Sequence, residues 1–133
     1  MIVVDANVLV YLHVPGQRTA QAEAVLERDP AWSAPLLWRS EFRNALLGLV
    51  RARVLEFPAA FGVLADAERG MAGAEYSVRS HAVFELAHRS GCSAYDCEYV
   101  SLAQDLGLKL VTTDREVLAA FPDLAISPEE FLR

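Results

Sequence analysis

Short apolar runs alternate along this chain with longer segments in which apolar residues recur every three or four positions. The short runs are candidate strands, and they lie at 2–4, 31–34, 75–78, 109–112 and 124–126. The longer segments are candidate helices, and they lie at 18–28, 36–53, 58–70, 80–90, 94–106 and 115–121. Strands alternating with helices favour βαβ units, so we expect an α/β fold with a mostly parallel sheet covered on both faces.

The size and composition of the chain favour one globular domain over residues 1–133. Of the 133 residues, 53% are hydrophobic and 23% are charged, which is ample for a packed core. The formal net charge of -6 argues mildly against a nucleic-acid ligand, because such proteins usually carry basic surfaces. An acidic site filled with divalent cations would weaken that objection, since the loaded site presents positive charge.

Neither the cysteines nor the N-terminus indicates secretion. Cys92 and Cys97 form no CxxC or Cys/His spacing and are expected to be buried thiols. The opening apolar run has no basic start and is interrupted by Asp5 and Asn7, so it fits neither a signal peptide nor a membrane span. We expect a cytoplasmic protein without membrane association.

Four carboxylates from distant parts of the sequence are expected to meet at one edge of the sheet. Asp5 and Asp114 each follow a strand, Asp96 begins a helix, and Glu41 lies one turn into a helix after a strand. Each residue alone has an ordinary explanation as a helix cap or an exposed side chain. Together they point to the carboxyl ends of the strands, where ligands bind in open α/β sheets.

A cluster of carboxylates requires cations. Two unit charges about 4 Å apart repel by roughly 4 kcal/mol at an effective dielectric near 20. Mg²⁺ or Mn²⁺ would remove this penalty, because both are hard ions that prefer oxygen ligands. We therefore expect one or two divalent ions per site, with metal-activated water as the nucleophile in hydrolysis of a phosphodiester.

Other catalytic constellations are missing from the sequence. The three histidines, His13, His81 and His88, form no triad and no zinc spacing. There is no Walker P-loop and no GxGxxG motif. These absences leave metal-dependent hydrolysis as the main hypothesis.

Four segments of the chain carry recognisable motifs: VVDANVLVYL at 3–12, SEFRNALLGLVRARVL at 40–55, SAYDCEYVSLAQDLGLKLVTTD at 93–114 and AISPEEFL at 125–132. Together these segments resemble PIN domains, and more narrowly the VapC toxins of bacterial type II toxin–antitoxin pairs. The resemblance implies a three-layer α/β/α sandwich with a five-stranded parallel sheet and a Mg²⁺- or Mn²⁺-dependent endoribonuclease. It also implies a homodimer, and a cognate antitoxin that covers the active site.

Transferred residue by residue, the resemblance places the acidic quartet of the family on the same four carboxylates. It places supporting polar groups at Asn7, Asn44 and either Thr112 or Thr113, with Thr113 preferred here for orienting ligands or water. Glu116 could add a distal carboxylate, but a solvated helix position is favoured.

Arginines near the quartet are candidates for RNA binding. Arg39 and Arg43 flank Glu41, and Arg115 follows Asp114. Arginine suits bidentate contacts with phosphate. The segment 36–61 is rich in apolar residues, which could belong to the core or form a groove for an antitoxin helix.

Rival functions differ from this hypothesis at particular residues. A haloacid-dehalogenase-type phosphatase needs a second aspartate two residues after the first, where this chain has Asn7. A receiver domain needs an acidic pair at the first strand, and Asp5 has no acidic neighbour. A catalytically weak PIN-fold binding module and a DNA nuclease stay open, because only contacts with the 2′-hydroxyl distinguish RNA.

Overall fold

A computed structural model describes residues 1–133 and contains a single five-stranded sheet. All strand pairs are parallel, and the strand order is β3-β2-β1-β4-β5. The strands are β1 (Ile2–Val4), β2 (Trp32–Pro35), β3 (Glu75–Tyr76), β4 (Leu110–Val111) and β5 (Ala125–Ile126). The central pair is in a register that sets Val3 opposite Leu110 and Val4 opposite Val111. The expected α/β fold with a five-stranded parallel sheet is therefore confirmed.

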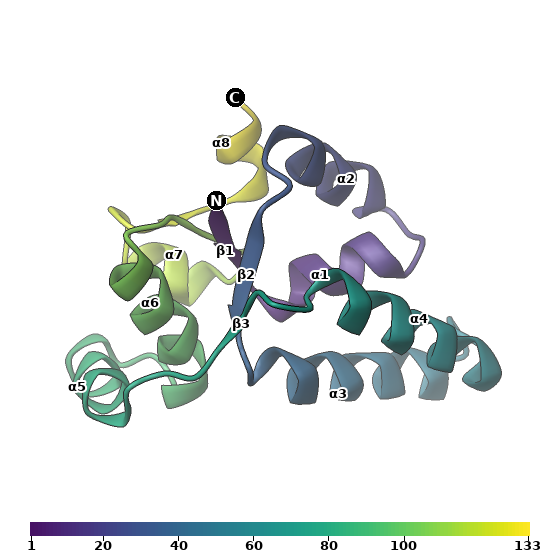
Figure 1. The fold of residues 1–133 in the computed structure, drawn as a ribbon, viewed down its shortest axis with the longest axis horizontal. Helices are drawn as coiled ribbons and strands as arrows, with labels where there is room; N and C mark the ends of the chain where they lie inside the picture. Colours follow the sequence, from purple (N-terminus) through teal and green to yellow (C-terminus); the bar gives the residue numbers. More distant parts are fainter.

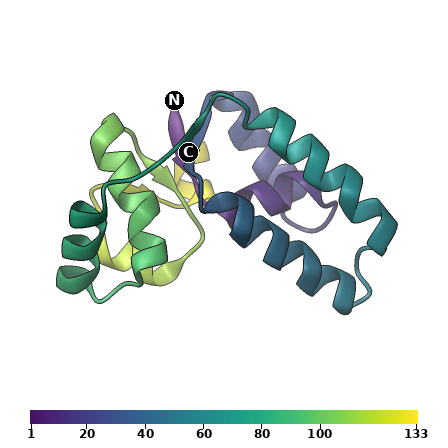
Figure 2. The same ribbon diagram turned by 60° about the horizontal axis from the view of Figure 1, so that its bottom comes forward.

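Eight helices surround this sheet. They are α1 (Ala6–His13), α2 (Thr19–Arg28), α3 (Trp38–Arg51), α4 (Phe57–Gly70), α5 (Ser80–Ser90), α6 (Ala94–Leu106), α7 (Arg115–Ala120) and α8 (Pro128–Leu132). Figure 1 shows α5, α6 and α7 on one side of the sheet and α1 to α4 on the other. The carboxyl ends of the strands point down in Figure 1, and Figure 2 turns this edge forward, between the two groups of helices.

Burial explains why these residues form these elements. Val3, Val4, Leu110 and Val111 are at most 1% exposed, as expected for central strands covered on both faces. Helix α3 buries Trp38, Phe42 and Leu46, which recur every four residues along one face. The buried hydrophobic side chains of both sides form one continuous cluster around the sheet.

Short side-chain caps set the helix ends that matter for the site. Asp5 caps α1, Ser93 caps α6 and Asp114 caps α7, each accepting a backbone N–H of the first turn. Gly107, in the left-handed region at φ 67°, ends α6 just before β4. Two of the four candidate carboxylates are therefore held in place by their own helix starts.

The structure adds two helices to those expected from the sequence, α1 and α8. The segment of α1 is apolar and rich in β-branched residues, a pattern that favours a strand as much as a helix. The N-cap at Asp5 favours the helix, because backbone N–H groups of the first turn donate hydrogen bonds to the Asp5 carboxylate and carbonyl. Helix α8 has only five residues, too few for a periodic pattern. None of the eight helices combines the length and apolar character needed to cross a membrane.

Candidate active site

A cavity of about 280 Å³ opens at the carboxyl ends of β1 and β4. Within the sheet, β2 and β3 follow β1 toward one edge, while β4 and β5 lie between β1 and the opposite edge. This reversal of strand order is where open α/β sheets bind their ligands. All four candidate carboxylates line the cavity, together with Asn7, Asn44, Tyr99 and Thr112.

Asp5 is fixed between the two central strands. Its backbone N–H donates to the Val111 carbonyl, which joins it to β4. One carboxylate oxygen, Oδ1, accepts the backbone N–H of Asn7 at 2.6 Å, and the other, Oδ2, accepts the Thr112 hydroxyl. The orientation of Asp5 is thus defined from both β1 and β4.

Asp114 follows β4 and begins α7. Its Oδ1 accepts the backbone N–H groups of Glu116 at 2.9 Å and Val117 at 3.1 Å. Its own N–H donates to the Thr112 Oγ1 at 3.0 Å, so one buried hydroxyl contacts both aspartates. Oδ2 of Asp114 makes no hydrogen bond with the protein, which leaves it available to a ligand.

Asp96 and Glu41 approach from opposite sides of the sheet. Asp96 lies in the first turn of α6, where its N–H donates to the Ser93 Oγ at 3.0 Å. Glu41 lies in the first turn of α3, and its Oε1 accepts the hydroxyl of Tyr99 at 2.6 Å. The quartet is thus supplied by two strand ends and two helices.

The negative charges of the quartet are not balanced by any positively charged side chain. Burial raises the pKa of Asp5, Glu41 and Asp96 above their ordinary values. Neighbouring acids add to the effect: Asp114 raises the pKa of Asp5 and Asp96, and Asp5 raises that of Glu41. None of the eight ion pairs of the molecule involves a quartet residue.

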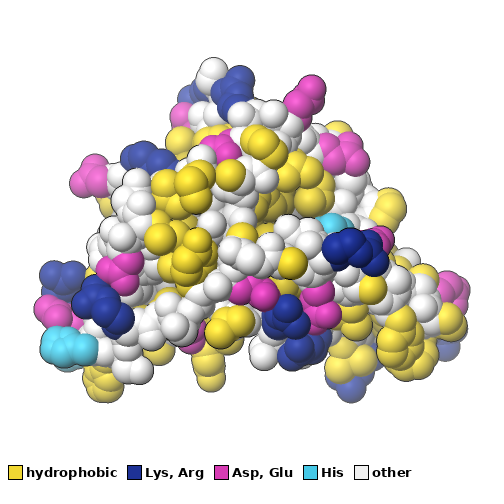
Figure 3. Space-filling view, viewed as in Figure 1, with side chains coloured by type: hydrophobic (Ala, Val, Ile, Leu, Met, Phe, Trp, Pro, Cys, Tyr) yellow, Lys and Arg dark blue, Asp and Glu magenta, His cyan; other side chains and the backbone are white.

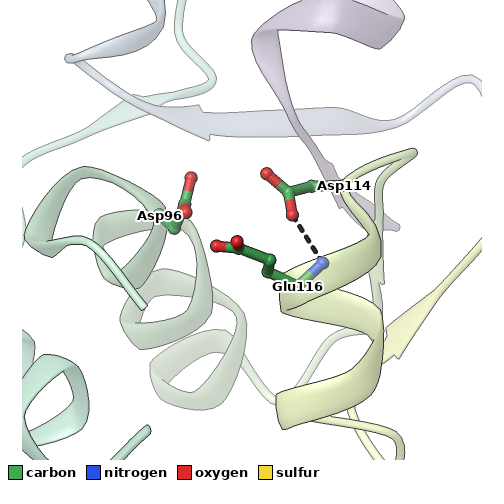
Figure 4. Close-up of side chains that lie close together, drawn as sticks. All are labelled: Asp96, Asp114 and Glu116. Atoms are coloured by element: carbon green, nitrogen blue, oxygen red, sulfur yellow. Dashed lines mark hydrogen bonds between the residues drawn. The ribbon is translucent and has the colours of Figure 1, made fainter. Parts of the chain in front are cut away.

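A fifth carboxylate belongs to this cluster. One oxygen each from Asp96, Asp114 and Glu116 lies within 4.8 Å of the others, although the Glu116 side chain is exposed. Figure 4 shows Asp96 from α6 facing Asp114 and Glu116 from the start of α7. Glu116 is thus exposed, as expected, and its carboxylate also lies beside those of Asp96 and Asp114, which favours the alternative of an added distal carboxylate. The Asp-x-Glu spacing at a helix start could have signalled it, because both side chains then lie at the same helix end.

These donors suit a hard divalent cation. The cluster offers carboxylate oxygens only, without histidine nitrogen or cysteine sulfur, and this set is typical of Mg²⁺ and Mn²⁺ rather than zinc. The raised pKa values of three unpaired acids also fit a site that gains stability when a cation neutralises it. The residues present therefore fit the metal expected from the sequence.

The expected supporting polar residues are distributed unevenly. Asn7 and Asn44 line the cavity, and neither side chain makes a hydrogen bond within the protein. The preference for Thr113 is corrected, because Thr112 is the threonine that contacts Asp5 and lines the cavity. Successive side chains of an extended segment point in opposite directions, so only one of two adjacent threonines can face the cavity.

Arg39 does not line the cavity but belongs to an ion-pair network. Its guanidinium contacts Glu75 at 2.6 Å and Glu68 at 3.1 Å, and the Trp38 indole N–H also donates to Glu75 at 2.7 Å. In Figure 3, basic and acidic side chains gather where α3 and α4 approach β3. Arg39 thus lies outside the cavity with its donors engaged by carboxylates, and its contact with RNA stays a prediction.

The other two arginines are more accessible. The side chain of Arg43 is 55% exposed, and its nearest acidic atom is on Glu68 at 3.9 Å. Arg115 is exposed beside Asp114 and forms no ion pair. Both remain candidates for contacts with a phosphate backbone.

The chain belongs to the PIN domain family, whose model matches residues 2–124. It is similar to Ribonuclease VapC3 of Pyrobaculum aerophilum, at 31% identity over 126 residues. The match covers 92% of this chain and 96% of that protein. The resemblance inferred from the sequence motifs is therefore confirmed.

Two solved structures share the fold along nearly the whole chain. A crystal structure of a protein from Pyrobaculum aerophilum has a TM-score of 0.78 and 27% identity, and the match covers 98% of this chain and 92% of that one. A toxin–antitoxin complex from Klebsiella pneumoniae contains a chain with a TM-score of 0.71 and 16% identity, covering 96% of this chain and 98% of that one. The second likeness concerns the fold alone.

Proposed function

We propose that this chain is a divalent-cation-dependent endoribonuclease and the toxin of a toxin–antitoxin pair. The observation that carries the proposal is the convergence of Asp5, Glu41, Asp96 and Asp114 on one cavity without any cationic side chain. Similarity to Ribonuclease VapC3 supports RNA as the substrate. The carboxylate chemistry supports Mg²⁺ or Mn²⁺, as one or two ions, as the cofactor.

The roles of the residues follow from their positions. The quartet and Glu116 would hold the cations, which when bound supply Lewis acidity toward phosphate oxygens and lower the pKa of a water nucleophile. Thr112 and the Asn7 N–H hold Asp5 in one orientation, and the first turn of α7 holds Asp114. Ligands fixed in this way lose little conformational freedom when a cation binds.

Arg115 and Arg43 are proposed to contact the phosphate backbone of the RNA. Arg115 is free of ion pairs and adjacent to Asp114, and Arg43 lies two residues from Glu41. Positive charge at these positions would offset the repulsion between the acidic cavity and a polyanion. The side chains of Asn7 and Asn44 would be free to donate to the substrate or to bound water.

We further propose that the protein acts in the cytoplasm as a homodimer controlled by an antitoxin. The segment 36–61 is divided in the structure: Trp38 is buried in the core, while Leu36, Phe57 and Phe61 are 51%, 59% and 59% exposed. Exposed aromatic side chains of this kind are common in protein interfaces. The structural neighbour from Klebsiella pneumoniae is a toxin–antitoxin complex, which supports a partner of this kind.

Cleavage of synthetic single-stranded RNA by the purified protein tests the proposal. We expect cleavage with Mn²⁺ or Mg²⁺, none with excess EDTA, and none by Asp5→Asn or Asp96→Asn. Glu23→Gln, an exposed acid on α2, is the matched control and should cleave like the unmodified protein. Full activity of both site variants would overturn the mechanism. Preferential cleavage of a DNA of the same sequence would replace the ribonuclease with a DNA nuclease.

A further inference from the structure

Tyr99 connects the two sides of the cavity. It lies on α6, is 4% exposed and lines the cavity, and its hydroxyl donates to Glu41 Oε1 at 2.6 Å. Glu41 belongs to α3, on the other side of the sheet from α6 (Figure 2). This contact is the only side-chain hydrogen bond between α3 and α6. Because Asp96 lies on the same helix as Tyr99, the contact fixes the position of the Glu41 carboxylate relative to Asp96.

Glu41 needs such a constraint more than the aspartates of the quartet. A glutamate side chain has more rotatable bonds than an aspartate, and ordering it costs more conformational entropy. The negative charges of Asp5 and Asp96 also repel its carboxylate. Without an attractive contact in the cavity, the side chain would turn away from these acids and toward solvent.

The hydroxyl of Tyr99 opposes both effects. A hydrogen bond from a hydroxyl to a carboxylate is stronger than one between neutral groups. It engages only Oε1 of Glu41, and Oε2 makes no hydrogen bond with the protein. Because the Tyr99 ring is packed in the core, the donor itself has little freedom to move.

We propose that Tyr99 is a positioning residue, which holds Glu41 in the cavity through Oε1 and so leaves Oε2 free for a divalent cation. The inference rests on the proposed metal-dependent function of this site. Tyr99 would not itself contact the cation or the RNA. Its effect on the cation would pass through Glu41, which distinguishes it from Thr112, the hydroxyl that contacts Asp5.

The chain contains a matched control on the same helix. Tyr95 is 64% exposed, donates no hydrogen bond to a protein group and does not line the cavity. Tyr95→Phe and Tyr99→Phe each remove one hydroxyl from a tyrosine of α6. A difference between the two variants would therefore report the contact with Glu41 and not a general effect of losing a hydroxyl.

Mn²⁺ affinity measured by calorimetry is the decisive readout. We expect Tyr99→Phe to weaken Mn²⁺ binding by about 10–100-fold, the range found when a group supporting a metal ligand is lost. Tyr95→Phe should bind like the unmodified protein. In the Glu41→Gln background, adding Tyr99→Phe should change the Mn²⁺ affinity by less than about twofold, because the two effects share one path.

Each result has a defined meaning. If the unmodified protein binds no Mn²⁺ and cleaves no RNA, the proposed function itself fails. If it does both and Tyr99→Phe binds Mn²⁺ equally well, the inference about Tyr99 is overturned while the function stands. Loss of the folded circular dichroism spectrum in Tyr99→Phe, or equal losses with and without Glu41, would make the hydroxyl a general structural contact and also overturn it.

Discussion

The cavity at the ends of β1 and β4 and the ion-pair network between α3, α4 and β3 use acidic residues in opposite ways. In the network, Arg39 lies against Glu75 and Glu68, and its hydrogen bond lowers the pKa of Glu75 below its ordinary value. In the cavity, burial and neighbouring acids raise the pKa of Asp5, Glu41 and Asp96. The two regions are connected by α3, which carries both Arg39 and Glu41.

This contrast distinguishes acids paired within the fold from acids that are candidates for binding a ligand. An acid paired with a protein cation has its charge balanced within the fold and has little capacity left for a ligand, and removing it leaves that cation unpaired. Unpaired acids gathered in a cavity cost stability, and a fold retains such a cost where a ligand offsets it. The position of Arg39 near Glu41 in the sequence therefore gave no sign of its ion pairs, which only its position in space shows.

Removing a cavity acid should have the largest effect on activity. We expect Asp96→Asn to lower RNA cleavage by more than about 100-fold, the upper range for groups that only support a metal ligand. Glu75→Ala should retain cleavage within about tenfold, because Glu75 lies outside the cavity. Initial rates at saturating Mn²⁺ measure both, and a larger loss in Glu75→Ala would break the comparison.

Cation binding should stabilise the cavity and not the network. At a free Mn²⁺ concentration about 100 times the dissociation constant, the free energy of unfolding should rise by about 2.7 kcal/mol. Thermal unfolding across a Mn²⁺ titration measures the gain. It should persist in Glu75→Ala and shrink in Asp5→Asn; a melting temperature that does not respond to Mn²⁺ would contradict the cluster.

Breaking the network should reduce stability by a somewhat smaller amount. Glu75→Ala leaves the indole N–H of Trp38, a side chain 0% exposed, without its acceptor. An unsatisfied buried donor costs about 1–3 kcal/mol. Urea unfolding of this variant beside Glu23→Ala, an exposed acid without an ion pair, provides the measurement; equal midpoints would show that the network contributes nothing.

Neutralising a cavity acid should stabilise the metal-free protein. This is the smallest expected effect, and it is opposite in sign to the loss of stability expected for Glu75→Ala. Because the folded-state pKa of Asp5 is raised, its charge costs stability above that pKa, and the cost disappears as the pH falls below it. In EDTA at pH 7 we expect Asp5→Asn to gain roughly 1 kcal/mol, the lower end of the repulsion between charges a few ångströms apart.

The pH dependence provides a check on that sign. The gain of Asp5→Asn should decrease as the pH falls through the raised folded-state pKa of Asp5, because protonation then removes the charge from the unmodified protein. Glu75, whose pKa is lowered, should behave in the reverse manner: its contribution to stability is present at neutral pH and is lost only as the pH falls through its folded-state pKa. Urea midpoints at several pH values separate the two; a gain for Asp5→Asn that is constant with pH would exclude a charge effect.

Much of the fold could be predicted from local patterns. Five apolar runs separated by helical segments imply a parallel sheet, and each of the five strands lies within two residues of its predicted bounds. The proximity of the two strand-end aspartates follows directly from this topology, because all carboxyl ends of a parallel sheet lie at one edge. The convergence of Asp5 and Asp114 thus needed only the order of elements along the chain.

Long-range pairing could not be predicted in this way. The partner of Arg39 is 36 residues away on the edge strand, and that of Tyr99 is 58 residues away on the opposite helical layer. Which of Thr112 and Thr113 contacts Asp5 depends on the direction in which each side chain points after β4. None of these contacts has a periodic or spacing signal.

The sequence alone determined the α/β class, the acidic quartet and the family resemblance, because these depend on residue type, periodicity and order. Only the tertiary structure decided which arginine was already paired, which threonine faced Asp5, that Glu116 joined the cluster and that Tyr99 held Glu41. The physical reason is that a hydrogen bond or ion pair depends on distances of a few ångströms between side chains, and packing of the whole chain sets those distances.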